Sequence, residues 1–282
     1  MFHEPNPFGT AETLTIDEGA PRRSTARANI RAIVIRASST VSRHVDVGRV
    51  QGVMDALPNP ERVRLFAVDY DSRLSRLPSL ARFPQLAHLH IGARRIRDYS
   101  PIHRLRALKN VFLVGYKHRD LADMAPLRLE ELRLIRGQIT TLDVSASWAL
   151  IQGCTQLRDL GDSSIRFLIL QACNKLSCDS LRKVRGLRRV DLLGCRGATE
   201  FSWMRACKTL QRLSVTATPS SRMDLSTLRG AHARQLFLSI PAAKLREVSN
   251  MLPEAAVSNG DVWYRGGAVG EGSDPLLEDA WR

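Results

Sequence analysis

One spacing of apolar residues recurs through the middle of the chain and constrains its fold more than any other feature. The stretch 187–195, LRRVDLLGC, follows the frame L-x-x-V-x-L-x-x-C. Copies of this frame begin at residues 86, 108, 129, 146, 165, 187 and 210, with a weak early copy at 62 and a degenerate last copy at 233. Successive starts differ by 17 to 24 residues, so the sequence predicts one structural unit repeated along the chain.

The frame predicts a short strand followed by a return segment. In L-x-L the side chains alternate, so we expect the leucines to point inward and the residues between them to point outward. The return halves carry apolar pairs three residues apart, such as Leu80 with Phe83 and Leu181 with Val184, which suit a short helix or 3₁₀ turn. One such coil cannot bury its apolar face alone, so we expect the coils to stack into a continuous core.

The frame resembles the leucine-rich repeat family, whose pattern is L-x-x-L-x-L-x-x-N/C-x-L with a period of about 20 to 29 residues. The resemblance covers about residues 62–250. Two features depart from the family: steps of 17 and 19 residues between 129 and 165, and few asparagines at the ninth position. The resemblance implies a right-handed α/β solenoid, a horseshoe with a parallel concave β-sheet and short helical, 3₁₀ or irregular convex segments.

Composition and turn signals outside the repeats predict five segments. We expect a flexible N-terminal segment at 1–28, a strand-helix cap or first coil at 29–61, the repeats at 62–250, a C-terminal cap at 251–265 and a flexible acidic tail at 266–282. In the cap at 251–265, Asn259 and Gly260 predict a turn, and residues 262–264 a hairpin edge.

The net charge of +14 comes mostly from 36 arginines spread along the chain. Nucleic-acid binding through phosphate contacts is therefore an alternative, but no block of five or six like charges occurs, and an acidic protein partner fits the charge as well. No apolar run approaches the roughly 18 residues of a membrane span, and the N-terminus lacks the pattern of a secretory signal. We expect a cytoplasmic monomer, with signal-less secretion as an alternative.

The five cysteines and the histidines carry no recognised catalytic or metal-binding spacing. Cys154, Cys173 and Cys195 share the ninth frame position, which in the leucine-rich repeat family points inward, so we expect them to be small buried residues. His88 and His90 lie two apart on one strand, and no third metal ligand is evident. We expect no catalytic residue, no metal and no cofactor, and Cys178 and Cys207 have no assigned role.

The candidate site is the outward face of the predicted strands. Exposed aromatic and aliphatic side chains flanked by arginine are typical of protein-binding surfaces. Besides the middle-strand Leu150, the predicted partner-binding residues are Arg64, Phe66, His90, Phe112, Val114, Arg133, Ile135, Phe167, Ile169, Arg189, Asp191, Arg212, Ser214 and Phe237. The alternative is that terminal segments of the chain cover some of these positions.

The resemblance to small bacterial intracellular leucine-rich repeat proteins implies recognition rather than catalysis. We expect a non-enzymatic scaffold that binds another protein through its concave sheet, as an inhibitor, an immunity protein or a regulatory protein. A secreted bacterial effector that acts on a host protein and a basic nucleic-acid-binding repeat protein are the alternatives.

Overall fold

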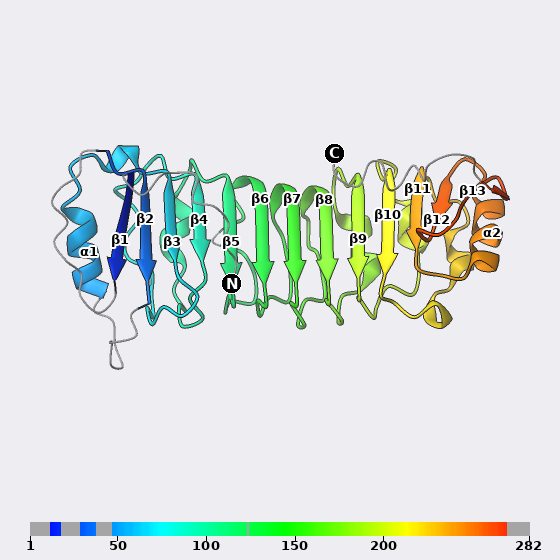
Figure 1. Cartoon of the computed structure of the whole chain (residues 1–282), viewed down its shortest axis with the longest axis horizontal. Helices are drawn as coiled ribbons and strands as arrows, with labels where there is room; N and C mark the ends of the chain where they lie inside the picture. Colours follow the sequence, from blue (N-terminus) through cyan, green and yellow to red (C-terminus); the bar gives the residue numbers. More distant parts are fainter. Residues whose placement is uncertain (1–11, 18–28, 38–46, 123, 270–282) are drawn as a thin grey trace. The chain divides into compact units, whose positions relative to one another are not determined.

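The computed structural model describes residues 12–17, 29–37, 47–122 and 124–269, and the chain divides into two compact units, Met1–Gly137 and Gln138–Arg282. Each unit is a stack of coils in which a strand is followed by a return segment that leads to the next strand (Figure 1).

The described part of the first unit contains parallel strands that pair in chain order. The strands are β1 (Thr13–Asp17), β2 (Ala32–Arg36), β3 (Leu65–Val68), β4 (His88–Ile91), β5 (Asn110–Val114) and β6 (Arg128–Ile135). The helices are α1 (Val47–Asp55) and the 3₁₀ helices η2 (Pro60–Arg62) and η3 (Ser100–Arg104).

The N-terminal part of this sheet differs from the prediction. Residues 13–17, expected within a flexible segment, form β1, whose Leu14 and Ile16 are 6% and 1% exposed. They alternate with polar residues, which is the signature of a strand with one buried face. The strand and helix expected within 29–61 are present as β2 and α1. The rest of 1–28 lies outside the described residues, apart from Glu12.

The register of β3 is shifted by one residue from the predicted frame, and this corrects the prediction for Phe66 and Arg64. Phe66 pairs with Leu89 and is fully buried, while Ala67 takes the outward position beside His90. The copy therefore begins at 63 rather than 62. The shift is favourable because the side chains of Phe66 and Val68 bury more apolar surface than those of Leu65 and Ala67 would.

Arg64 lies one residue before β3, outside the outward positions of the strand. Its Nη1 donates to the carbonyl oxygen of Glu61 at 2.6 Å. The prediction of Arg64 and Phe66 as outward strand residues was therefore wrong, since both came from the same misplaced frame.

The second unit continues the same plan. Its parallel strands, in pairing order, are β7 (Ser145–Gln152), β8 (Ser164–Gln171), β9 (Arg189–Leu193), β10 (Arg212–Thr216), β11 (Gln235–Leu238) and β12 (Ala256–Ser258). Antiparallel strands β13 (Trp263–Arg265) and β14 (Ala268–Val269) follow. The helices are η4 (Cys178–Lys183), η5 (Ser202–Arg205), η6 (Ser220–Arg222), η7 (Leu225–Leu228) and α2 (Ala242–Met251).

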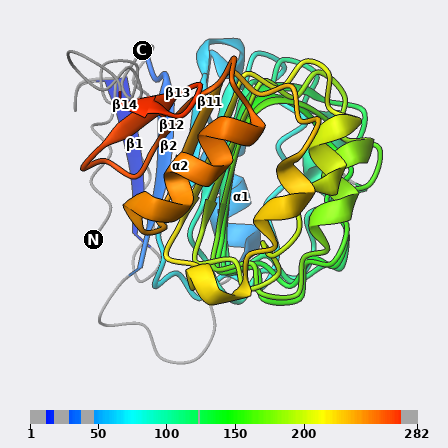
Figure 2. The same cartoon turned by 90° about the vertical axis from the view of Figure 1, so that its right-hand side faces the viewer.

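The predicted frame holds in the second unit, including the short coil from 146 to 165. Ala146 pairs with Ile165, and the inward residues Ile165, Leu168 and Leu170 are fully buried. Most of the return segments predicted from apolar pairs form helices, which Figure 2 shows across the coil from the strands of this unit. The 19-residue coil is shorter because its return segment has no helix.

A left-handed turn ends each of four successive strands of the second unit. Gly153, Ala172, Gly194 and Ala217 have φ of 63°, 54°, 61° and 54°. The turn directs the next side chain inward, and at three of the four positions that residue is a cysteine. Glycine suits this conformation because it has no Cβ, whereas alanine adopts it at a cost of about 1–2 kcal/mol.

The C-terminal cap forms the expected hairpin between β12 and β13. Gly260 has φ of +97°, and the Asn259 side chain accepts hydrogen bonds from the backbone N–H groups of Asp261 and Val262. The flexible acidic tail was predicted from residue 266, which was wrong for 266–269, because Gly266 and Gly267 form a turn and Ala268 and Val269 form β14 against β13. Residues 270–282 lie outside the described residues.

The α/β solenoid predicted from the repeat is confirmed in both units: parallel strands carry the inward leucines, and return segments complete the coils. Within the described residues, no helix is both long enough and apolar enough to cross a membrane.

Candidate functional site

The outer face of a strand consists of the third, fifth and seventh frame positions, whose side chains point away from the coil interior. In β8 these are Phe167, Ile169 and Gln171. Phe167 is 36% exposed, and together with Val269 it makes up the exposed large apolar side chains of the described residues.

Four outer-face residues of the second unit form what we call the apolar patch: Trp148, Leu150, Phe167 and Ile169. Strand pairing sets Trp148 beside Phe167 and Leu150 beside Ile169. Neighbouring strands lie about 4.8 Å apart, so these side chains share one surface. Three of the four are half-buried and Phe167 is exposed, which leaves an apolar surface that water reaches.

An ion pair borders the apolar patch on the next strand, β9. Arg189 pairs with Phe167 and Asp191 pairs with Ile169 in the sheet register. The Arg189 guanidinium contacts the Asp191 carboxylate through Nε at 3.0 Å and Nη2 at 2.8 Å, and Asp191 is only 6% exposed. Two short contacts between a guanidinium and a carboxylate are typical of a strong charge-assisted ion pair. Arg189 therefore largely neutralises the negative charge of Asp191.

Two further arginines lie on the same side of the patch as this ion pair or next to Phe167. Arg212 on β10 lies beside Arg189, and Arg166 carries its Cζ 5.8 Å from the centre of the Phe167 ring. Of the ten acidic residues in the described segment 138–269, only Asp191 lies on a strand. The outer face of the second unit therefore combines apolar and cationic groups without a free carboxylate.

The remaining predicted residues of this unit extend the same face. Ser214 pairs with Asp191 on one side and Phe237 on the other. Phe237 is half-buried, and a Cβ on Gly260 would lie 3.5 Å from its ring, so the C-terminal turn lies against it. The chain thus covers part of Phe237 itself, as the alternative interpretation anticipated for terminal segments.

The first unit presents a different outer face. The His90 and Phe112 rings pack edge to face at 5.9 Å, and His88 Nδ1 lies 3.0 Å from the Asn110 side-chain nitrogen. Arg133 forms an ion pair with Glu131 on its own strand.

Val114 and Ile135, predicted to be exposed, point outward but are each only 8% exposed, so they offer little surface to a partner. The prediction that these two side chains are exposed was therefore wrong.

The prediction missed Trp148, which sits at the same frame position as Phe167, Arg189 and Arg212. The signal was present, because the copy ASWALIQGC places tryptophan at its third position. Alanines replace the first two leucines of this copy, so the frame is weakly marked there and its register is hard to assign from sequence.

The cysteines are structural, as predicted for the ninth position. Cys154, Cys173 and Cys195 are at most 1% exposed. The Sγ atoms of the latter two donate to carbonyl oxygens of the preceding coil, Cys173 to Ile151 at 3.5 Å and Cys195 to Leu170 at 3.3 Å. A hydrogen bond with the Cys195 thiol, together with burial, raises the pKa of Cys173.

Cys178 and Cys207, which had no predicted role, are also buried, at 5% exposure each. Burial raises their pKa values to about 12 and about 11, so both are protonated core thiols at neutral pH. Within the described residues, no group of three or more His, Cys, Asp or Glu side chains could hold a metal ion.

No protein-family model matches the chain, and no curated protein matches it. Among solved structures, an internalin (InlF) from Listeria monocytogenes aligns over 82% of this chain and 74% of its own, with 14% identity and a TM-score of 0.45. A leucine-rich repeat protein from Leptospira interrogans aligns over 82% and 78%, with 11% identity and a TM-score of 0.36. The assignment of the fold rests on the coils of the chain itself: the repeated frame, the buried leucines and the parallel strands make it a leucine-rich repeat protein in fold.

Proposed function

We propose that the chain is a non-enzymatic scaffold that binds another protein through the outer face of its second unit. The observation that carries this proposal is the apolar patch, with exposed Phe167 at its centre and arginines around it. A tryptophan and a phenylalanine side by side supply large contact area at low entropic cost, and aromatic residues and arginine dominate the energetics of protein interfaces.

The charges of this face favour an acidic partner. Arg166 borders the patch and Arg212 lies one strand further on, beside Arg189, while the only acidic residue on the described strands of this unit is neutralised by Arg189. A carboxylate of the partner would meet cations and no opposing charge, which favours its approach and fixes its orientation. The partner would therefore present an apolar anchor next to acidic side chains.

The biological role we infer is sequestration or inhibition of that partner by an intracellular inhibitor, immunity or regulatory protein that acts as a monomer. A secreted bacterial effector would use the same surface on a host protein and differs only in where the partner is found.

Nucleic acid is the competing occupant of this face, because aromatic side chains with arginine also bind single strands. One observation favours protein: Leu150 and Ile169 offer aliphatic contacts to a partner rather than the stacking contacts that bases need.

Site-specific cross-linking tests the proposal. A photo-reactive amino acid is placed at Ile169 in otherwise native chain, and a control chain carries it at exposed Arg182 in η4, on the return side. After irradiation in the source lysate, we expect one dominant cross-linked adduct from the chain labelled at 169. Protease should remove this adduct and nuclease should leave it intact. The chain labelled at 182 should not form this adduct. Nuclease-sensitive adducts, or equal adducts at both positions, would contradict the proposal.

The residues around the cross-link supply a matched pair of variants. Phe167→Ser removes the exposed apolar group of the patch, and Val269→Ser removes the other exposed large apolar group, which lies in the C-terminal hairpin. The adduct at 169 should be lost with Phe167→Ser and retained with Val269→Ser.

A further inference from the structure

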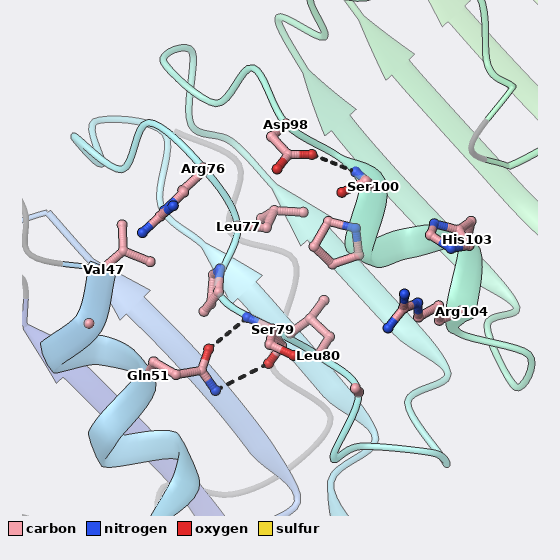
Figure 3. Close-up of a pocket in the computed structure, with 14 residues that line it drawn as sticks. Val47, Gln51, Arg76, Leu77, Ser79, Leu80, Asp98, Ser100, His103 and Arg104 are labelled. Carbon is pink, nitrogen blue, oxygen red and sulfur yellow. Dashed lines mark hydrogen bonds between the residues drawn. The ribbon is translucent and has the colours of Figure 1, made fainter.

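The first unit contains a cavity of about 440 Å³ that the protein-binding proposal does not use. It lies between the start of α1, the return segment 76–81 and the segment 98–104 that includes η3 (Figure 3). Its lining comes from α1 and the return segments, so the cavity is separate from the outer face of the strands. Its volume falls in the range of small-molecule sites, which is about 300–1,000 Å³.

Hydrogen bonds fix two walls of this cavity. Gln51 Oε1 accepts from the backbone N–H of Ser79 at 2.6 Å, and Gln51 Nε2 donates to the Ser79 carbonyl at 3.5 Å, as Figure 3 shows. On the other wall, Asp98 Oδ1 accepts from the backbone N–H of Ser100 at 3.0 Å. These bonds tie α1 to the 76–81 segment and order the start of η3, so the cavity is formed before any ligand enters.

The cavity combines an apolar base with cationic side chains. Leu77 and Leu80, which line it, are 5% and 0% exposed. Arg76 and Arg104 extend from opposite sides in Figure 3, and neither forms a salt bridge with another described residue. Arg76 attracts the Asp98 carboxylate electrostatically without a salt bridge, so both guanidinium groups keep their hydrogen-bonding forks available to a ligand.

The single carboxylate of the lining is already engaged. Hydrogen bonds from the Ser100 side chain and backbone lower the pKa of Asp98, so it is ionised at neutral pH and held at the start of η3. With Arg76 and Arg104 charged, the lining carries a net positive charge.

We propose that this cavity binds a small organic anion, a carboxylate or phosphate ester attached to an apolar body. The planar guanidinium fork of arginine matches both anionic groups, and the leucine and proline surfaces between the arginines suit the apolar body. Cationic groups alone would favour inorganic anions and apolar groups alone would favour neutral ligands, so the combination defines the ligand class.

Calorimetric titration of the full chain with four probes tests this class. Phenyl phosphate and benzoate carry both features, benzyl alcohol lacks the charge, and inorganic phosphate lacks the apolar body. We expect at least one of the first two to bind at least about tenfold more tightly than either control probe, and the better one identifies the preferred anion. Equal binding of benzyl alcohol, equal binding of inorganic phosphate, or no binding of either aryl anion at millimolar concentration would overturn the proposal.

Variants place the binding in this cavity. Arg76→Gln and Arg104→Gln should each weaken the preferred aryl anion by about tenfold, and Ala81→Trp should fill the cavity and abolish binding. Arg106→Gln is the matched control, because Arg106 is exposed and does not line the cavity. Unchanged affinity in both lining-arginine variants would overturn the proposal. All of these residues are exposed, so circular dichroism should show an unaltered fold.

Discussion

Replacing Phe66 by alanine tests the register of the first unit. The Phe66 ring is fully buried between the inward residues Ile33 and Leu89 of the neighbouring strands. A buried phenylalanine removes about 150–250 Å² from water, worth about 4–6 kcal/mol at 25 cal/mol per Å². Alanine retains part of this and leaves a cavity, so we expect the free energy of unfolding to fall by about 3–5 kcal/mol.

Phe112→Ala is the matched control, since Phe112 is half-buried on the outer face and contacts the His90 ring. We expect it to cost about 1 kcal/mol, the typical value of an aromatic pair. Urea unfolding followed by far-UV circular dichroism measures both variants. The register would be refuted if Phe66→Ala lowered the free energy of unfolding by less than about 1 kcal/mol, or if Phe112→Ala lowered it by more than Phe66→Ala does. Either result would place the Phe66 side chain on the outward face.

Three further predictions follow from local features. Gly194→Ala should lower the free energy of unfolding by about 1–2 kcal/mol because Gly194 has a φ of +61°; crowding adds little, since the new Cβ would meet only Ala217 Cβ at 4.0 Å. Gly52→Ala in α1, where nothing lies within 4 Å of the new Cβ, should raise the free energy of unfolding by about 0.5–1 kcal/mol. A higher urea midpoint for Gly194→Ala than for Gly52→Ala would exclude the left-handed turn. None of the five cysteines should react with Ellman's reagent at pH 8 in the folded chain and all five should react in urea, because all five thiols are buried and inaccessible to the reagent; rapid reaction of any thiol before unfolding would show that the interior of the coils is open. A hydrogen bond from Lys183 lowers the pKa of Asp159, so the ion pair stabilises the fold above about pH 4 and stops doing so as the pH falls through the folded-state pKa of Asp159. The difference in urea midpoint between the native chain and Asp159→Asn should therefore shrink toward pH 2. A difference that stays constant with pH would contradict the ion pair.

Much of the fold could be predicted from the sequence because inward frame positions are apolar in nearly every copy. The frame also predicted the burial of Cys173 and Cys195, since a repeat assigns the same environment to equivalent residues. It failed at Leu65 and Phe66, where two adjacent apolar residues allow either register and only pairing with Leu89 decides between them.

The candidate site was predicted less completely than the fold. Alternation gives the direction of a side chain but not what covers it, which is why Val114 and Ile135 point outward and are still buried. Phe237 is partly covered by a turn about twenty residues later in the chain, and no local pattern encodes such a contact. Trp148 was missed because alanines stand where its copy should carry leucines.

The dissociation constant of the purified complex with the cross-linked partner tests the central claim most directly. Phe167→Ser should weaken binding by at least about 2 kcal/mol, or roughly thirtyfold, and Arg212→Gln should weaken it and reduce its dependence on salt. Val269→Ser should leave the dissociation constant unchanged. Equal affinities of Phe167→Ser and Val269→Ser would contradict binding through the outer face of the second unit.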